Sequence, residues 1–506
     1  MKDRSHNLNS IYDEYYKITG MWWANIYNML DPLREEISRK RGLYRLSQIR
    51  NWIERLYSDD YVKISYDTKK YLEKNNARTL RRLIYDYLLI FDFINAFYYM
   101  DIYIKLKYIK YKKYQIMMQK LKSFLEKIKK KLEDKEDIVV FWNDCISYDE
   151  LQWFPKLNKK RNNSLFFEYA YTPTPYTTPT MFAMVNKWMN IDDFSKYNVR
   201  NLDYDNSKLL DIVQKYGYKT KYFSGRDRHC VLSKKIQHQN SREFISSCRL
   251  CFDAISELLC SDSKQFMIIH CIPETHFPFW YPDREGNEIM PLFAFDSVNL
   301  AETSSRKYRQ IRNAALYWDN EVNFYSDLMG NSIGKIFMSD HGKYYEQYGY
   351  KDWAEARHHI FFMIQSKYVN EKRENHIFSL ENFSEIVDAL MKAYKFEKKA
   401  DFSSAFVNDY VRMQKVDIYG KDLVDKYIKM GCAENAQSYR GIRTKEECYI
   451  RFRNRELYFR NGNEKKNLID APEFSDRIEN LRMLAGDYFI DIDGDEKFQY
   501  ARKLYE

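Results

Sequence analysis

The sequence predicts an α/β fold built on a doubly wound, mostly parallel sheet with helices on both sides. Short apolar runs of strand length alternate with helical segments between residues 138 and 395. Two of these runs, 138–142 and 333–338, stop abruptly at polar residues. Buried strands have this pattern when they deliver polar side chains to the carboxyl edge of a sheet. The composition agrees, because 45% hydrophobic and 30% charged residues are typical of a globular chain.

The chain has 506 residues, which is enough for about three domains. We place a helical domain at residues 1–136, the α/β domain at 137–400 and a C-terminal subdomain at 401–506. The net charge of +10 permits an anionic substrate without demanding one, and we expect no nucleic acid partner.

Neither a secretory leader nor a membrane span is expected. The first 16 residues lack an apolar stretch, and the most apolar window, 83–104, contains three aspartates. Cys248 and Cys251 form a single C-x-x-C without a second pair, so we interpret them as reduced core thiols on a helix. The sequence therefore favours a cytoplasmic protein.

The first 136 residues are predicted to be helical, because apolar residues recur at intervals of three and four. Residues 103–132 are predicted to form one long basic helix. Its lysines admit two interpretations. They form either the solvated face of a helix that packs through an apolar stripe, or a surface that docks a partner or a membrane.

Each element of the α/β region has its own local signal. Apolar runs rich in β-branched and aromatic residues predict strands, and apolar residues three and four apart predict helices. Beyond residue 440, alternating faces at 449–460 predict an antiparallel hairpin, and a helix follows at 475–484. The other predicted strands are 138–142, 165–171, 218–224, 266–270, 333–338 and 360–364, and the helices are 181–189, 209–216, 244–259, 301–328 and 354–359.

Polar residues at the strand ends are candidate metal ligands. Asp144 follows the first strand, and Asp340 and His341 follow the strand at 333–338. A carboxylate oxygen and an imidazole nitrogen suit a divalent ion of the zinc or manganese kind. Gly342 would let the backbone turn sharply behind them. The alternative is an ordinary strand-to-loop turn.

A threonine-rich turn, 171–180, precedes the helix predicted at 181–189. Unpaired backbone N–H groups at a helix start favour an anion. A threonine at such a place can cap the helix or act as a nucleophile beside a metal ion.

Taken in order, these segments resemble the sulfatase-like branch of the alkaline phosphatase superfamily. The ordered segments run through residues 138–490 and leave the N-terminal helices uncovered. The resemblance implies a helix-flanked sheet followed by a small antiparallel sheet. The matching segments are Asp144, the threonine-rich turn, Glu274-Thr275-His276-Phe277-Pro278, Tyr317-Trp318-Asp319, Phe337 to Gly342, His359, and the tail segments 455–459 and 472–474.

The resemblance offers two candidate nucleophiles. In the sulfatase pattern C-x-P-S-R, the nucleophile position falls on Thr177, but Met181 replaces the arginine. No cysteine or serine stands there for conversion to formylglycine. The phosphoethanolamine transferases of this superfamily place a threonine five residues before a proline, and that register selects Thr174. Thr174 is therefore our first choice and Thr177 our second.

The resemblance also implies the roles of the remaining candidates. A divalent metal ion, zinc first and manganese or calcium as alternatives, would be held by ligands from several segments. His276 would serve in catalysis and in substrate binding, and His270 and Arg284 would bind substrate. The implied metal ligands are Asp144, Thr174, Asp340, His341 and His359.

The resemblance implies a metal-dependent hydrolase or transferase that cleaves a phosphate ester or diester through a phosphothreonine intermediate, and the chemistry of a metal-activated hydroxyl agrees with it. The substrate would be a glycan or a lipid head group, with phosphoethanolamine transfer as one form of the reaction. A sulfate ester hydrolase is the alternative. A third hypothesis is a non-catalytic member of the fold that binds a partner.

Overall fold

The computed structural model describes most of the chain, with gaps. Every structural statement below concerns the described residues, which are 5–21, 60–186, 207–224, 237–240, 246–276, 279–284, 305–342, 353–415, 439–452, 455–461, 463 and 466–486.

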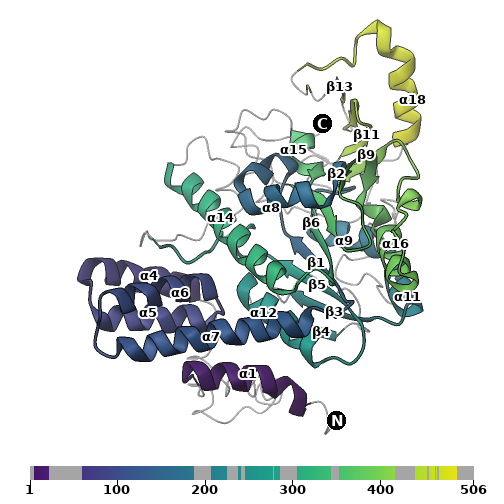
Figure 1. Cartoon of the computed structure of the whole chain (residues 1–506). Helices are drawn as coiled ribbons and strands as arrows, with labels where there is room; N and C mark the ends of the chain where they lie inside the picture. The colour runs from purple at the N-terminus through teal and green to yellow at the C-terminus, as the bar shows by residue number, and fades with distance from the viewer. Residues whose placement is uncertain are drawn as a thin grey trace, which may run out of the picture.

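A nine-stranded sheet forms the centre of the molecule (Figure 1). Its strands are β1 (Ile138–Asn143), β2 (Leu165–Tyr171), β3 (Lys219–Ser224), β4 (Gln237–Asn240), β5 (Gln265–Cys271), β6 (Gly334–Ser339), β7 (His359–Ile360), β8 (Phe362–Gln365) and β9 (Lys372–Ser379). The order is β4-β3-β5-β1-β6-β8-β2-β7, and β9 pairs with β2. The strands from β4 to β6 are all parallel, and β8 runs antiparallel to both of its neighbours. The predicted mostly parallel sheet is confirmed.

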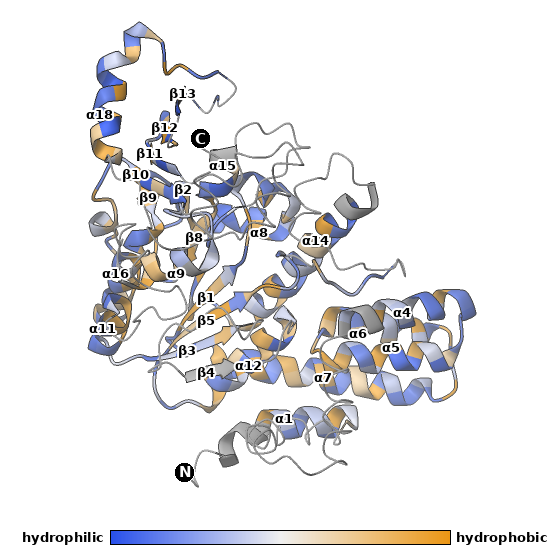
Figure 2. Ribbon diagram, turned by 180° about the vertical axis from the view of Figure 1, so that it is seen from behind, coloured by the Kyte–Doolittle hydropathy of each residue, from blue (hydrophilic) through white to orange (hydrophobic). Residues whose placement is uncertain are grey.

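Helices cover both faces of this sheet. They are α8 (Pro155–Lys160), α9 (Thr177–Asn186), α11 (Lys208–Lys215), α12 (Ser247–Cys260), α14 (Ser305–Leu328), α15 (Trp353–His358) and α16 (Phe383–Phe396). Val139 and Phe141 pack on the side of α12 and α14, whereas Val140 and Trp142 pack on the side of α9, α11 and α16. Every residue of β1 is buried, as expected for a strand covered on both faces. Figure 2 shows hydrophobic residues in the central strands and in the helices beside them.

The predicted elements of the α/β region are observed with small shifts at their ends, except that the single strand predicted at 360–364 is two strands, β7 and β8. α9 begins at Thr177, four residues before the predicted start, so the threonine-rich turn itself enters the helix. The predicted residues 187–189, 244–245 and 301–304 lie outside the described part of the chain.

The N-terminal region is helical, as predicted. Its helices are α1 (Ser5–Thr19), α4 (Asp60–Lys74), α5 (Ala77–Leu89), α6 (Phe93–Lys105) and α7 (Tyr111–Leu132). Asn76 and Asp92 cap the starts of α5 and α6 with their side chains. The apolar residues of these helices join those of α12 and α14 in one continuous core.

The single helix predicted at 103–132 is wrong, because the chain turns between α6 and α7. Lys107 and Lys110 have φ angles of 49° and 73°, which a continuous right-handed helix does not allow. The Tyr103 hydroxyl donates to the Ile109 carbonyl across this turn at 2.5 Å. The packed stripe of α7 is confirmed by the burial of Met117, Leu121 and Phe124, among others, while docking of a partner or membrane stays a prediction.

A four-stranded antiparallel sheet follows the main sheet along the chain. Its strands are β10 (Val411–Lys415), β11 (Tyr439–Arg443), β12 (Glu447–Arg451) and β13 (Glu456–Arg460), and α18 (Ser475–Ala485) packs on it. β12 and β13 form the predicted hairpin, and the predicted small C-terminal sheet is confirmed. Among the described helices, none combines the length and apolar character that crossing a membrane requires.

Candidate metal centre and active site

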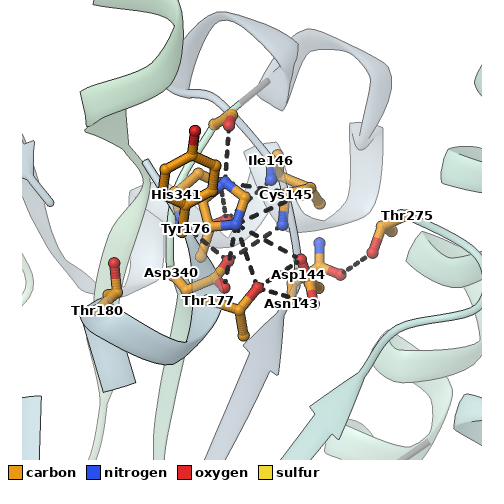
Figure 3. Close-up of polar contacts among 12 residues, drawn as sticks. Asn143, Asp144, Cys145, Ile146, Tyr176, Thr177, Thr180, Thr275, Asp340 and His341 are labelled. Carbon is orange, nitrogen blue, oxygen red and sulfur yellow. Dashed lines mark hydrogen bonds and ion pairs between the residues drawn. The ribbon is translucent and has the colours of Figure 1, made fainter. Parts of the chain in front are cut away.

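The site lies where the central strands end. β1 pairs in parallel with β6, and Asn143 lies opposite Ser339. Asp144 and Asp340 therefore leave the sheet side by side at its carboxyl edge, as their positions after two strands predicted. Figure 3 shows their side chains converging with those of His341 and Thr177.

The backbone of residues 339–342 is held by contacts that leave little freedom. The Ser339 hydroxyl accepts from the Ile146 amide and donates to the His341 carbonyl, each at 2.9 Å. A Cβ atom at Gly342 would lie 2.0 Å from the Ala356 carbonyl oxygen. Glycine is needed here because the backbone of another segment approaches so closely.

Asp340 presents one oxygen to the protein and the other to the site. Its Oδ1 accepts from the amides of Cys145 at 3.1 Å and His341 at 2.8 Å. Its Oδ2 is buried, accepts no hydrogen bond from the described residues, and lies 3.5 Å from His341 Nε2. A buried carboxylate oxygen without a donor fits a cation.

The orientation of the His341 ring shows which of its two nitrogens can bind a metal ion. Nδ1 lies 2.8 Å from the Gly342 carbonyl, which can only accept, so Nδ1 carries the proton. Nε2 is then a lone-pair donor. It lies 3.2 Å from Thr177 Oγ1 and 3.9 Å from Asp144 Oδ1. Ligands about 2.1 Å from one tetrahedral ion stand about 3.4 Å apart, so these separations suit a shared metal ion.

Asp144 is held by a buried histidine. Its Oδ2 lies 3.3 Å from His270 Nε2, and His270 Nδ1 lies 2.7 Å from the Tyr222 hydroxyl. The His270 ring also stacks on Trp142 with a centroid distance of 4.2 Å. His270 is completely buried, and its predicted role in substrate binding stays a prediction.

The two carboxyl groups have opposite pKa shifts. Burial alone would raise the pKa of Asp144, but the imidazoles of His276, His270 and His341 outweigh it and hold that pKa well below its usual value. For Asp340, burial and the charge of Asp144 raise the pKa. A cation between the two carboxylates would offset the free-energy cost of burying the charged form of Asp340 and the repulsion between the two negative charges.

Thr177, the first residue of α9, is the threonine that reaches this cluster. Its Oγ1 lies 3.4 Å from Asp144 Oδ2 as well as 3.2 Å from His341 Nε2. Thr174, our first choice from the sequence, lies elsewhere. Its hydroxyl is 2.9 Å from that of Thr180 and packs with Thr172 in a buried group of hydroxyls.

Two other predicted residues are also placed away from the cluster. The His359 ring lies between Tyr148 and Tyr171, at centroid distances of 4.1 and 4.6 Å, and its Nε2 donates to the Glu168 carbonyl at 3.0 Å. His359 therefore packs at the edge strand β7 instead of joining the ligands. Arg284 packs on α6, where its guanidinium donates to Asn95 and covers the Tyr98 ring.

His276 stands on the turn that follows β5. Its amide donates to the Ile272 carbonyl at 2.9 Å, and Thr275 beside it donates to Asn143 Oδ1 at 2.8 Å, which ties this turn to β1. The half-buried imidazole is close enough to lower the pKa of Asp144. Its role in catalysis and substrate binding stays a prediction.

Sequence reasoning missed Cys145. Its sulfur lies 3.5 Å from His341 Nε2, and its ligand atom belongs with those of Asp144 and His341 to one group that could hold a metal ion. The available signal was its place directly after Asp144. A second group of this kind comprises Asp144, His270 and Asp340.

Comparisons with known proteins bear on the family and the fold. The family model described as Sulfatase matches residues 140–393. A solved structure of a 2-O GAG sulfatase aligns with a TM-score of 0.52 at 13% identity, covering 69% of this chain and 91% of that one. The phosphonate monoester hydrolase from Silicibacter pomeroyi aligns with a TM-score of 0.52 at 11% identity, covering 70% and 96%. At such identities the likeness concerns the fold. Among curated proteins, no match by sequence is found.

Proposed function

The chain belongs to the sulfatase family within the alkaline phosphatase superfamily, and on that premise we propose that it cleaves a phosphate ester through Thr177 at a metal centre. One observation carries the proposal. A threonine hydroxyl stands at a helix start within 3.4 Å of Asp144 and His341, which are both candidate metal ligands. A nucleophile needs this proximity to be activated.

Asp144, Asp340 and His341 would hold the ion, with zinc as first choice because an imidazole joins the carboxylates. When bound, a divalent ion of this kind lowers the pKa of a nearby hydroxyl and draws charge from the ester oxygens. The chain's own residues prepare the site for it. Gly342 fixes the proton of His341 on Nδ1, and His270 orients Asp144.

The proposed reaction has two chemical steps. Thr177 loses its hydroxyl proton to solvent, its Oγ1 forms a bond to phosphorus, and the bond to the leaving oxygen breaks. His276 supplies the proton that the leaving oxygen takes up. Water or an acceptor hydroxyl then attacks phosphorus and gives its proton to His276, the bond between phosphorus and Thr177 Oγ1 breaks, and Thr177 takes a proton back from solvent. The positive end of the α9 helix dipole would stabilise the transferred anion.

A phosphorus ester is favoured over a sulfate ester because Thr177 occupies the nucleophile position of C-x-P-S-R. A threonine offers no thiol or serine hydroxymethyl group for conversion to a formylglycine aldehyde. The substrate class we propose is a phosphorylated glycan or lipid head group, and phosphoethanolamine transfer is the specific form that the sequence motif suggests.

The test is a panel of aryl esters supplied to the purified full chain with zinc, manganese or calcium. We expect release from a phosphate monoester or diester, and an Asp340→Asn variant should lose metal content and activity together. Release of sulfate alone would identify a sulfatase. A metal-loaded protein that cleaves no phosphate, phosphonate or sulfate ester would support the non-catalytic alternative.

A further inference from the structure

We propose that the turn between α6 and α7, together with the first turns of α7, docks this protein on the surface of an anionic lipid membrane. We call this surface the basic tip, and it consists of three exposed aliphatic side chains and three exposed lysines. The inference goes beyond the proposed function and does not depend on the reaction at the metal centre. The residues of the basic tip are Leu106, Lys107, Ile109, Lys110, Lys112 and Ile116.

The aliphatic side chains of the basic tip are in contact with water. Ile109 is 83% exposed, Ile116 is 52% exposed and Leu106 is 50% exposed. Among the large hydrophobic side chains of the described residues, that of Ile109 is the most exposed. Each of these side chains would gain free energy by leaving water, so the basic tip favours a partner that takes up apolar groups.

The backbone of the turn is fixed in a shape that keeps these side chains exposed. Lys107 and Lys110 have φ angles of 49° and 73°, in the left-handed region that residues with a Cβ rarely adopt. The Tyr103 hydroxyl donates to the Ile109 carbonyl at 2.5 Å and holds the turn closed, while the Ile109 side chain remains exposed. Strained backbone of this kind is concentrated at functional sites.

The charges around the aliphatic side chains are all positive. Residues 102–125 contain seven lysines and no arginine, aspartate or glutamate. Lys107, Lys110 and Lys112 form no ion pair with a described residue. Their charges are therefore available to an anionic partner. Near an anionic membrane surface, each basic residue strengthens binding about fivefold.

Helical spacing extends the same combination along α7. Ile116 lies four residues after Lys112 and four residues before Lys120, so the three side chains lie on one face of the helix. All three are exposed, whereas Met117 and Leu121 belong to the packed stripe. An aliphatic side chain between lysines suits a helix at a membrane interface, where the aliphatic group enters the head-group layer and the ammonium groups remain in water.

The place and size of the basic tip favour a membrane over a macromolecule. α7 has 22 residues and is therefore about 33 Å long. Its end leads into β1, so its start lies at the far end of the helical bundle from the sheet (Figure 1). A stable protein interface buries about 800 Å² per partner, and three aliphatic side chains at a projecting turn supply only part of that area. A nucleic acid would bind the lysines but would offer little to the aliphatic side chains.

The test is flotation of the purified full chain with vesicles of phosphatidylcholine, alone or in an equimolar mixture with phosphatidylserine. We expect binding to the mixed vesicles that weakens as the salt concentration rises, and at least about tenfold weaker binding to the neutral vesicles. Replacing two lysines together, Lys107→Gln and Lys112→Gln, should lower the partition coefficient on mixed vesicles about 30-fold, because each lysine contributes about fivefold. Ile109→Ser should lower this coefficient at least about tenfold, because an apolar side chain is lost.

Matched controls remove the same groups elsewhere. Lys129→Gln with Lys130→Gln removes two exposed lysines from the last turn of α7, and Met483→Ser removes an exposed apolar side chain from α18. Both control proteins should bind the mixed vesicles as the wild type does. A loss in the controls as large as the loss in the tip variants would overturn the assignment to the basic tip.

The wild-type protein alone can refute the inference, so the test does not depend on how the variants fold. Absence of binding to the mixed vesicles at low salt, or equal binding to both kinds of vesicle, would refute it. Binding of polyglutamate or duplex DNA through the same lysines, in a protein that binds neither kind of vesicle, would also refute it, since the surface would then serve an acidic polymer.

Docking and catalysis can be tested separately. The tip variants should hydrolyse a water-soluble aryl phosphate at the wild-type rate, because the basic tip lies away from the metal centre (Figure 1). A protein that binds the mixed vesicles but cleaves no ester would support the docking surface and refute the proposed function. Ester cleavage by a protein that binds no vesicles would do the reverse.

Discussion

Replacing Thr177 by alanine tests the proposed nucleophile directly, and Thr174→Ala provides a matched comparison from the same turn. Thr177 is only partly buried, and its contacts of 3.2 and 3.4 Å are long for hydrogen bonds. Its loss should therefore change the free energy of unfolding by less than about 1 kcal/mol. If Thr177 forms the bond to phosphorus, kcat should fall by at least about 10⁴-fold, which corresponds to about 5.5 kcal/mol of barrier.

The Thr174→Ala variant should show the opposite pattern. Thr174 is buried, and its hydroxyl shares a 2.9 Å contact with Thr180. We expect a stability loss of about 1 kcal/mol, because one buried hydrogen bond disappears, and a kcat within about tenfold of the wild type.

Both variants should be compared with the wild type by hydrolysis of an aryl phosphate, by urea unfolding and by metal content. Mass spectrometry of quenched reactions should locate the phosphoryl group on the peptide that contains Thr177. The reasoning fails if Thr177→Ala keeps its turnover while Thr174→Ala loses activity with fold and metal content intact.

Three further predictions concern the metal, the glycine and pH. Zinc at about 100 times its Kd should raise the free energy of unfolding of chelator-treated protein by about 2.7 kcal/mol, and an unchanged Tm would argue against a site. Gly342→Ala, whose Cβ would lie 2.0 Å from the Ala356 carbonyl, should cost about 1–3 kcal/mol in thermal unfolding and weaken zinc binding in titrations, and normal zinc affinity would contradict the geometry. Burial raises the pKa of Asp137 from 3.8 to about 6. The folded state therefore binds more protons than the unfolded one in this range, and its stability should fall by about 2–3 kcal/mol as pH rises from about 4 to above 6. In urea unfolding, Asp137→Asn should remove this dependence, and equal pH profiles for variant and wild type would refute it.

Much of the fold followed from local patterns. The ends of β1 and β2 were predicted to within one residue, because polar residues on either side of an apolar run mark where the strand begins and ends. The convergence of Asp144 with Asp340 was also foreseeable, since parallel strands end at the same edge of a sheet. By contrast, the break between α6 and α7 depends on left-handed residues and on a contact of Tyr103, which helical periodicity does not reveal.

The sequence alone determined the fold class, the family resemblance and the strand ends that carry Asp144, Asp340 and His341. Only the tertiary structure showed that Thr177, and not Thr174, lies beside His341, that the His359 ring lies between two tyrosines, and that Cys145 lies beside His341. The physical reason is that hydrophobic periodicity reports which way a strand or helix faces. At a turn the direction of each side chain depends on contacts with distant segments, such as the hydroxyl of Thr180 or the rings that enclose His359.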